Sequence, residues 1–356
     1  GSQDYDFVLR CAEQAVNIRH IPKILYHWRA HKDSTAENPE SKRYAFEAGI
    51  RAIQAHYDRC GIDAEVSAEQ LNGIYRSKYR LKEQPLVSVI IPNKDHTEDL
   101  DKCIRSIEEK GTYKNIEYIV IENNSQKKET FAYYEKLQAE NPKVKVVFWE
   151  REFNYSAINN YGVGFAKGEY LLFLNNDTEI INPDCIEELL GYCMRDDVGI
   201  VGARLYYEDD TIQHVGVIIG LGGVAGHTFV GEPKDSLGYF GRIVTAQDYS
   251  AVTAACLMTK RKVFEKVNGF EEKLAVAFND VDFCLKVREA GYLVVYNPYA
   301  ELHHYESKSR GLEDTEEKVL RFQGEFRTSQ SSGKEIRKEG VRIYSPNWIL
   351  DKTDLG

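Results

Sequence analysis

Three polar residues follow a buried strand at a point where a metal-bound phosphate can be held. The apolar run Tyr170–Leu174 predicts a buried strand, and Asn175, Asn176 and Asp177 come directly after it. A carboxylate in this position can bind a divalent cation, and the cation can bridge a diphosphate. A single Asp after a strand is more often a turn residue or a helix N-cap, so Asp177 alone leaves both interpretations open.

Two further groups carry the side chains that acid–base or metal chemistry needs. Asp280 and Asp282 begin a predicted helix, where acidic residues commonly stabilise the helix dipole. The functional alternative is that Asp280 faces a cleft and accepts a proton from a hydroxyl. His303 and His304 follow a later predicted strand. Histidine pairs usually lie on the surface, but one beside the same sheet edge as Asp177 can complete a metal site.

The glycine-rich segment 220–226 does not predict a dinucleotide site. It follows the apolar run Val215–Ile219, but the dinucleotide fingerprint requires a helix directly after the glycines. Gly231 and Pro233 interrupt the residues that follow, so we interpret the segment as a flexible loop. A Rossmann dehydrogenase is therefore a remote alternative, and the sequence also lacks a Walker A loop, a Gly-x-Ser-x-Gly elbow and a His-Glu-x-x-His helix.

Strands and helices alternate with short connections from Pro85 onward. The predicted strands cover 86–91, 116–121, 144–149 and 170–174, with helices from Thr97, near 127–139 and near 155–166. This alternation predicts an α/β fold with a mixed, mostly parallel sheet flanked by helices. Ligands bind beyond the carboxyl ends of such strands. The residues expected at a site are therefore Pro92–Asp95, Glu122–Ser125 and Asn175–Asp177.

Composition excludes several classes of protein. The chain has 356 residues, with 46 basic and 56 acidic side chains, and its net charge of −10 argues against a nucleic acid partner. A hydrophobic fraction of 42% is typical of a soluble globular protein. Seven widely spaced cysteines without a CxxC pair indicate a reducing compartment. With no apolar run of membrane-spanning length and no signal-peptide pattern, we expect a cytoplasmic protein.

The beginning of the chain repeats a later segment. Gln3–Arg10 parallels Asn279–Lys286 at a constant offset of 276 positions. Two later matches keep this register to within one residue: Pro22 with Pro298, and Leu25–Trp28 with Leu302–Tyr305. Three matches in one register predict that residues 1–36 are the end of a second copy of the main domain. An ordinary helix followed by a strand is the alternative.

Taken together, the ordered motifs resemble the inverting glycosyltransferases of family 2, which have the GT-A fold. The resemblance covers about Pro85 to Gly311. It is carried by Val-Ser-Val-Ile-Ile-Pro at 87–92, Ile-Val-Ile-Glu-Asn-Asn-Ser at 119–125, Leu-Leu-Phe-Leu-Asn-Asn-Asp at 171–177 and Phe-Asn-Asp-Val-Asp-Phe-Cys-Leu at 278–285. Later stretches, including Asp-Thr-Ile-Gln-His-Val-Gly at 210–216, are similar to bacterial polysaccharide enzymes described as rhamnosyltransferase-like.

The resemblance implies roles for individual residues. Asp280 matches the catalytic base, and Asp177 and His304 match the metal-contacting residues. The expected donor-binding residues are Pro92, Asn93, Lys94, Asp95, Glu122, Asn123, Asn159, Asn160, Asn175 and Asn176. The usual Asp-x-Asp motif is Asn-Asn-Asp here, which leaves one carboxylate and implies that the metal, Mn²⁺ or Mg²⁺, arrives largely bound to the donor diphosphate.

The implied reaction is a metal-dependent, inverting transfer of a sugar from a UDP- or dTDP-sugar to a hydroxyl of a glycan or lipid-linked glycan in surface polysaccharide synthesis. The alternative is a non-catalytic nucleotide-sugar-binding scaffold whose metal motif has decayed. Peripheral contact with the inner membrane face and a homodimer are compatible with the resemblance. We expect four segments: a remnant of a preceding domain at 1–36, a helical linker at 37–84, the GT-A domain at 85–312 and a C-terminal extension at 313–356.

Overall fold

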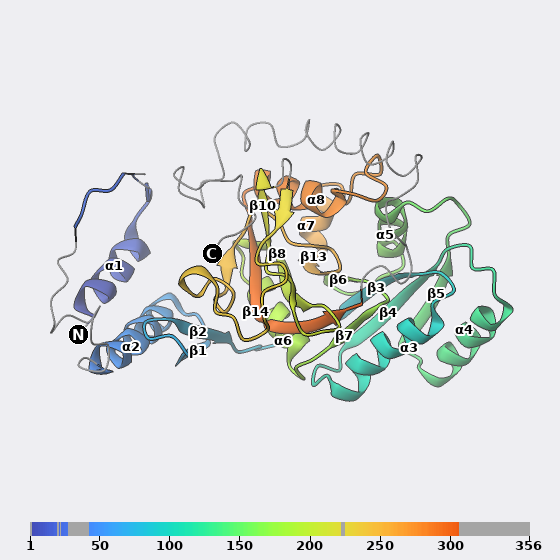
Figure 1. Ribbon diagram of the computed structural model, residues 1–356, viewed down its shortest axis with the longest axis horizontal. Coiled ribbons are helices and arrows are strands. Elements are labelled where there is room, and N and C mark those ends of the chain that lie inside the picture. Colours follow the sequence, from blue (N-terminus) through green and yellow to red (C-terminus); the bar gives the residue numbers. More distant parts are fainter. Residues whose placement is uncertain (1, 20, 22, 28–42, 222–224, 306–356) are drawn as a thin grey trace. The chain divides into compact units, whose positions relative to one another are not determined.

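A computed structural model describes residues 2–19, 21, 23–27, 43–221 and 225–305 (Figure 1). The expected C-terminal extension at 313–356 lies outside these residues. The chain divides after Lys82 into two compact units, which we describe separately. The described residues contain no helix that is long and apolar enough to cross a lipid bilayer.

The first unit combines two helices with a hairpin. Helix α1 covers Gln3–Gln14 and α2 covers Arg43–Cys60, and strands β1 (Ala64–Ala68) and β2 (Tyr75–Tyr79) pair antiparallel. The expectation of a helical linker at 37–84 is therefore wrong for its second half. Gly61, with φ of 67°, ends α2 in the left-handed conformation that glycine favours. Beyond it, burial alternates with the two-residue period of a strand.

An ion-pair cluster joins the two helices of this unit. The Glu13 carboxylate lies 2.7 Å from Nη2 of Arg59 and 2.8 Å from Nδ1 of His56. Hydrogen bonds from Arg59 and His56 lower the pKa of Glu13 to about 2. Cys60 adds a thiol 3.7 Å from the same imidazole, which gives a set of metal-ligand types. Because Arg59 already bonds both Glu13 oxygens, we interpret the cluster as an ion pair.

The two copies of the sequence repeat are both helical but differ in burial. Helix α1 corresponds to α8 (Asn279–Glu289). The Phe283 side chain of α8 is fully buried, whereas its counterpart Phe7 is 62% exposed. The residues after α1 also present large apolar side chains to solvent, namely Val16, Ile18, Ile21, Ile24, Leu25 and Tyr26. This part of the chain thus has the composition of a packed segment without its burial.

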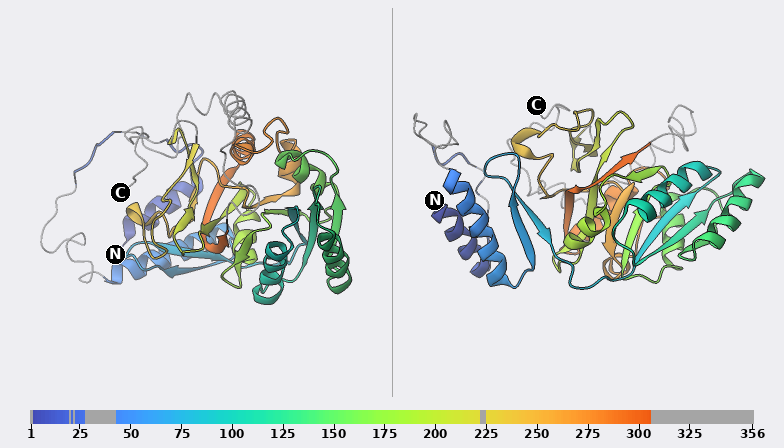
Figure 2. Two further views of the ribbon diagram at one scale, coloured as in Figure 1. Left: turned by 45° about the vertical axis from the view of Figure 1, so that its right-hand side comes forward. Right: turned by 90° about the horizontal axis from the view of Figure 1, so that it is seen from below.

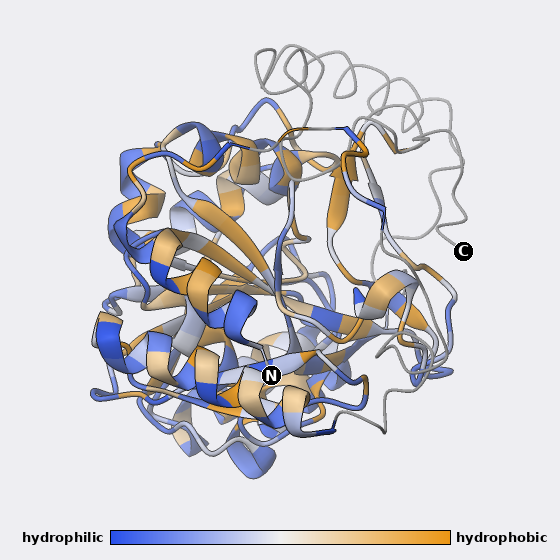
Figure 3. Ribbon diagram, turned by 90° about the vertical axis from the view of Figure 1, so that its left-hand side faces the viewer, coloured by the Kyte–Doolittle hydropathy of each residue, from blue (hydrophilic) through white to orange (hydrophobic). Residues whose placement is uncertain are grey.

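The second unit is built on one mixed sheet. Its principal strands lie in the order β14-β8-β13-β6-β3-β4-β5, and all are parallel except β13. They cover Val87–Asn93 (β3), Ile116–Glu122 (β4), Val144–Phe148 (β5), Tyr170–Leu174 (β6), Val198–Tyr206 (β8), Cys256–Lys260 (β13) and Leu293–His304 (β14). The expected mixed, mostly parallel sheet is confirmed. Figure 3 shows that its strands are predominantly hydrophobic, as strands covered on both faces must be.

Short strands extend this sheet at its edge. Strand β7 (Thr178–Ile180) and β12 (Gln247–Asp248) pair antiparallel with β14, and β9 (Ile212–His214) pairs antiparallel with β8. A separate hairpin consists of β10 (Val217–Ile219) and β11 (Ala225–His227). All of these short strands come after β3–β6 in the chain. They carry several of the side chains described below.

Helices cover both faces of the sheet. Helices α3 and α4 lie on one face of the β3–β4–β5 region and α5 lies on the other (Figures 1 and 2), as right-handed crossovers require. The helices cover Thr97–Arg105 (α3, continued as a π-helical turn at Ser106–Lys110), Lys128–Glu140 (α4), Tyr155–Val163 (α5), Cys185–Cys193 (α6) and Arg261–Lys266 (α7), with a 3₁₀ turn at Tyr239–Gly241.

A cluster of buried phenylalanines anchors α8 to the sheet. The Phe270 ring lies 4.9 Å from Phe173 on β6 and 4.7 Å from Phe283 on α8, measured between ring centroids. Phe264 on α7 completes the cluster, 5.6 Å from Phe283. The position of α8 therefore depends on apolar packing against β6.

The difference in burial between Phe283 and Phe7 predicts different effects of the same substitution. Phe283→Ala should reduce the free energy of unfolding by about 3–5 kcal/mol, because it removes a fully buried ring. Phe7→Ala, the matched control from the repeat, should change it by less than about 0.5 kcal/mol. Urea unfolding followed by circular dichroism measures both. Equal losses would contradict the difference in packing.

Candidate active site

A cavity of about 800 Å³ opens at the carboxyl ends of the parallel strands. One part of its wall consists of the residues that follow β3, β4 and β6, as the sheet topology predicts. The other part comes from the segment before β13, the start of α8, the end of β14 and the short strands β9 and β11. The polar residues of the lining include Asn93, Asp95, Asn123, Asn175, Asp177, Gln213, His227, Asp280 and His304.

Asp177 and His304 meet at this cavity because β7 pairs with the end of β14. His304 lies opposite Thr178 in the antiparallel register, and the Tyr305 N–H donates to the Asp177 carbonyl at 2.9 Å. Nε2 of His304 is 3.3 Å from Oδ1 of Asp177, and both side chains are buried. The two residues proposed to contact the metal are thus brought together.

The surroundings of this pair fit a divalent cation. Oδ1 of Asp177 receives no hydrogen bond from the described residues, although it is buried. The carboxylate oxygen and the imidazole nitrogen, 3.3 Å apart in a buried position, are two ligand types that one divalent cation can bind. Mn²⁺ and Mg²⁺ accept such ligands.

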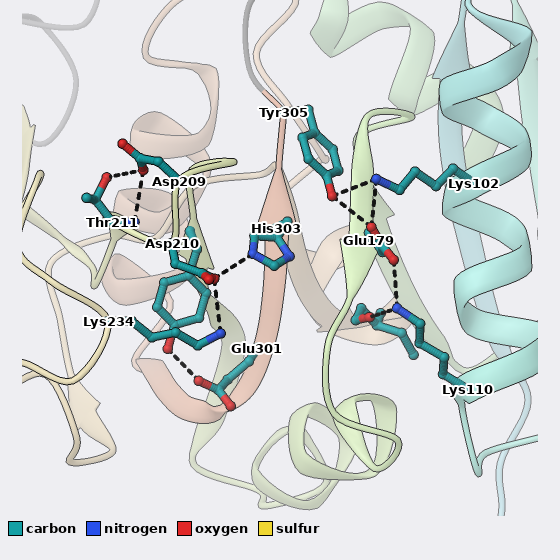
Figure 4. A network of polar contacts seen from close by, with 12 residues as sticks. Lys102, Lys110, Glu179, Asp209, Asp210, Thr211, Lys234, Glu301, His303 and Tyr305 are labelled. Atoms are coloured by element: carbon teal, nitrogen blue, oxygen red, sulfur yellow. Dashed lines mark hydrogen bonds and ion pairs between the residues drawn. The ribbon is translucent and has the colours of Figure 1, made fainter.

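Ion pairs hold the strand segment that carries His304 on both sides (Figure 4). His303 bonds the Asp210 carboxylate at 2.8 Å. On the other side, the Tyr305 hydroxyl donates to Glu179 at 2.7 Å. Burial alone would raise the pKa of Glu179, but hydrogen bonds from two lysines and Tyr305 lower it to about 2. These contacts hold the residues on both sides of His304 and so restrain its backbone.

The lysines of this network are Lys102 and Lys110. Their ammonium groups lie 2.8 Å and 2.7 Å from the Glu179 carboxylate. Lys102 comes from α3 and Glu179 from β7, so the network ties the helix to the strand that leads away from Asp177 (Figure 4).

Asp280 lines the cavity from the start of α8. Its two carboxylate oxygens accept hydrogen bonds from the backbone N–H groups of Val281, at 2.8 Å, and Ala254, at 3.2 Å. The preceding Phe278 has a φ of 59°, a left-handed conformation that is costly for a bulky residue and is typical of functional sites. Asp282, in contrast, is not part of the cavity lining; it is buried 3.5 Å from Lys286.

A buried chain of hydrogen bonds links the ends of three strands beside the cavity. The Asn176 amide donates to Asn93 at 2.5 Å, and Asn93 donates to the Tyr134 hydroxyl at 2.8 Å. Tyr134 donates to the Glu122 carboxylate at 2.6 Å, which also accepts from Ser125. Glu122 was expected to bind the donor, but these contacts occupy its carboxylate and it does not line the cavity.

Asp95 and Asn123 shape the cavity through backbone contacts. Asp95, with φ of 58°, accepts hydrogen bonds from the backbone N–H groups of Gln126 and Lys127 at 3.0 Å and so caps the segment leading into α4. Burial opposes this effect, but the hydrogen bonds lower the pKa of Asp95. Asn123 donates to the carbonyl oxygen of Trp149 at 3.1 Å. Pro92 and Lys94 also line the cavity, as expected.

Asn159 and Asn160 differ from expectation. Neither lines the cavity. The Asn159 amide donates to the Tyr155 carbonyl within α5, and Asn160 bonds both the N–H and the carbonyl of Phe270 at 3.0 Å. Asn160 thus stabilises the loop before α8, whereas Asn159 bonds within its own helix.

Several cavity residues were missed by sequence analysis. They are His96, Phe153, Tyr155, Tyr207, Gln213, His227, Val230, Thr253, Ala254, Ala255, Val276, Phe278 and Asn279. Gln213 lies in the motif at 210–216 and Asn279 directly precedes Asp280, so both were visible as part of a pattern without an assigned role. His227 directly follows the glycine-rich segment, which we interpreted only as a loop.

Comparison with known proteins places this site in a family. Residues 88–267 match the family described as Glycosyl transferase family 2. The chain is 44% identical over its whole length to "Uncharacterized protein y4gI" of Sinorhizobium fredii and 35% identical to "O-antigen biosynthesis protein RfbC" of Myxococcus xanthus, of which it spans 39% and 27%. A segment of 60 residues, 17% of the chain, is 37% identical to 20% of an N-acetylglucosaminyl-diphospho-decaprenol L-rhamnosyltransferase of Mycobacterium tuberculosis.

Solved structures of glycosyltransferases share the fold. A mannosyltransferase from Pyrobaculum calidifontis, in complex with GDP-Man and Mn²⁺, aligns with a TM-score of 0.53 and 16% identity over 83% of this chain and 74% of its own. GalNAc-T7, with UDP, GalNAc and Mn²⁺, aligns with a TM-score of 0.54 and 15% identity over 65% of this chain and 46% of its own. The expected GT-A fold is confirmed.

The geometry of Asp177 and His304 predicts where a metal binds. His304→Ala and Asp177→Asn should each weaken Mn²⁺ binding at least about tenfold, because loss of a ligand costs no less than loss of a residue that orients one. Mn²⁺ titration in the presence of UDP, followed by electron paramagnetic resonance, measures this. His56→Ala is the control, since His56 lies in the first unit and bonds Glu13. Unchanged affinity in both ligand variants would place the metal elsewhere.

Proposed function

Because this chain belongs to glycosyl transferase family 2, we propose that it is a metal-dependent inverting enzyme that transfers a sugar from a nucleotide-diphosphate donor to a hydroxyl group. The observation that carries the proposal is the convergence of Asp177, His304 and Asp280 on one cavity at the carboxyl ends of the strands. Fold alone does not support this conclusion, since related folds host many activities.

The donor and acceptor classes follow from the relatives. The names of two relatives refer to O-antigen biosynthesis and to rhamnosyl transfer onto a lipid diphosphate, which supports a glycan or lipid-linked glycan acceptor in surface polysaccharide synthesis. We propose a UDP- or dTDP-sugar as donor. A lipid-linked acceptor would require peripheral contact with the inner membrane face, which we propose as the place of action.

Different residues of the cavity would bind the nucleoside and the diphosphate of the donor. Asn93 ends β3, Lys94 follows it and Asn123 follows β4. These three residues would contact the nucleoside. Asp177 and His304 would hold Mn²⁺ or Mg²⁺, and a bound cation neutralises charge on the leaving diphosphate.

Asp280 would act as general base. Each of its oxygens accepts one backbone hydrogen bond, which fixes the carboxylate and leaves lone pairs to accept a proton. The acceptor hydroxyl loses its proton to Asp280 as its oxygen forms the bond to the anomeric carbon, and the bond to the diphosphate oxygen breaks. Attack and departure on opposite faces invert the anomeric centre.

One observation favours a second candidate. Asn175 and Asn176 leave a single carboxylate in the motif, which suits a nucleotide-sugar-binding scaffold without turnover. Calorimetric titration of UDP and dTDP with and without Mn²⁺, together with hydrolysis of a panel of nucleotide sugars, separates the two. Metal-dependent binding with slow hydrolysis supports the enzyme, whereas metal-independent binding without hydrolysis supports the scaffold.

The general-base role of Asp280 predicts a selective loss of turnover. Asp280→Asn should reduce sugar transfer about 10²–10⁴-fold while nucleotide affinity stays unchanged, because the amide cannot accept the proton. Release of the nucleoside diphosphate and its calorimetric binding measure the two effects. Asp282→Asn is the matched control on the same helix and should keep transfer within a few-fold. Near-normal transfer by Asp280→Asn would remove it from the role.

We also propose that residues 1–36 are the end of a preceding transferase-like domain. The repeat aligns Asp4 with Asp280 and His27 with His304, but the aligned part contains no counterpart of the strands that carry the nucleotide-binding residues. Because none of the described residues of this segment lines the cavity, donor hydrolysis by the main domain should not depend on it. The exposed apolar side chains around Phe7 and Ile21 support an origin as a packed segment.

Deletion tests this second proposal. Removing residues 1–36 should leave donor hydrolysis by the main domain within a few-fold of the full chain, because no residue of the cavity lies in the deleted part. Initial rates with a hydrolysable donor from the panel measure this, and circular dichroism checks folding. Complete loss of hydrolysis in a folded, truncated protein would show that the segment belongs to the functional unit.

A further inference from the structure

We propose that Gln213 is a positioning residue that holds the imidazole proton of His304 on Nδ1 and thereby keeps Nε2 open for the cation. The inference rests on the proposed function, in which His304 contacts the metal. Gln213 itself touches neither the diphosphate nor the reacting atoms in this scheme. Its effect is on the tautomer and orientation of another side chain.

Gln213 contacts both the ring and the backbone of His304. Its Oε1 lies 2.7 Å from Nδ1 of His304, and its Nε2 donates to the carbonyl oxygen of the same residue at 3.2 Å. The carbonyl can only accept, so the amide nitrogen must face it and the amide oxygen must face the ring. With only 4% of the residue exposed, this orientation is also fixed by packing.

The amide orientation determines the tautomer. Because Oε1 of Gln213 can only accept a hydrogen bond, Nδ1 of His304 carries the proton. Nε2 then carries a lone pair, and the Asn175 amide nitrogen, 3.0 Å away, donates to it. A cation that binds Nε2 takes the place of this hydrogen bond. Two independent neighbours thus agree on the same tautomer, and the lone pair lies on the side of Asp177.

The opposite tautomer of His304 would block cation binding. A proton on Nε2 of His304 would be 3.3 Å or less from Oδ1 of Asp177, a buried oxygen that receives no other hydrogen bond. The resulting hydrogen bond would use both proposed metal ligands at once. Gln213 prevents this because releasing Nδ1 would leave its own buried oxygen without this hydrogen bond. The glutamine therefore favours the metal-binding form before any cation arrives.

Strand pairing brings Gln213 close to His304. Strand β9 pairs with β8, and β8 runs parallel to β14, so Gln213 lies within reach of the residue that ends β14. The ion pairs beside His303 and Tyr305 restrain the same backbone from the outside (Figure 4). Ring orientation comes from Gln213, and backbone position comes from these ion pairs.

Two substitutions separate positioning from packing. Gln213→Leu keeps the approximate volume but cannot accept the Nδ1 proton, and should weaken Mn²⁺ binding about 10–100-fold. Gln213→Glu offers a carboxylate oxygen to the same proton and should bind Mn²⁺ at least as tightly as the unmodified chain. Titration with MnCl₂ in the presence of UDP, followed by electron paramagnetic resonance, measures both, and thermal unfolding shows whether each variant folds.

A measurement on the unmodified chain tests the tautomer without any substitution. Nitrogen-15 NMR of metal-free protein, recorded at a pH at which the His304 ring is neutral, should show its single proton on Nδ1, with His304→Ala used to assign the signals. A proton on Nε2 would overturn the proposal. So would Mn²⁺ affinity in Gln213→Leu equal to that of the unmodified chain while His304→Ala loses the metal. If His304→Ala itself keeps full affinity, the proposed metal site fails and the positioning proposal falls with it.

Discussion

A buried carboxylate governs the architecture around the cavity. Glu122 is 2% exposed and accepts hydrogen bonds from the Tyr134 hydroxyl, the Ser125 hydroxyl and the Ser125 N–H. Burying such a group is costly unless its oxygens are bonded, so these donors must stay in place. Through Tyr134 and Asn93 the same chain reaches Asn176, which ties the ends of β4, β3 and β6 together. The loops that form the cavity start from this fixed base.

The opposite wall depends on strand pairing rather than on a polar network. Antiparallel pairing of β7 with β14 brings Asp177 to His304, and Glu179 and Asp210 restrain the neighbours of that histidine by hydrogen bonds. The site thereby concentrates one carboxylate and one imidazole in a buried position. With so little negative charge of its own, it suits a cation that arrives with phosphate oxygens. This agrees with the departure of Asn175 and Asn176 from the usual acidic motif.

The two copies of the repeat share a pattern of residues but differ in how far their side chains are buried. Phe7 and Phe283 occupy equivalent positions in two helical segments, yet one is mostly exposed and the other belongs to a cluster of aromatic rings. Helix formation depends on contacts within a few residues and is shared by both copies. Burial of Phe283 depends on rings from other elements, namely Phe173 of β6 and Phe264 of α7, which pack against it.

The sequence by itself determined four parallel strands of the sheet, at 86–91, 116–121, 144–149 and 170–174, and the edge at which polar residues gather, because apolar periodicity and turn residues act locally. It also identified Asp177, His304 and Asp280 as side chains for one site. Only the tertiary structure decided that Glu122, Asn159 and Asn160 turn away from the cavity and that residues 64–79 form a hairpin. The same holds for Gln213, whose role depends on a ring 91 positions away. The direction of a side chain is decided by partners that local sequence does not contain.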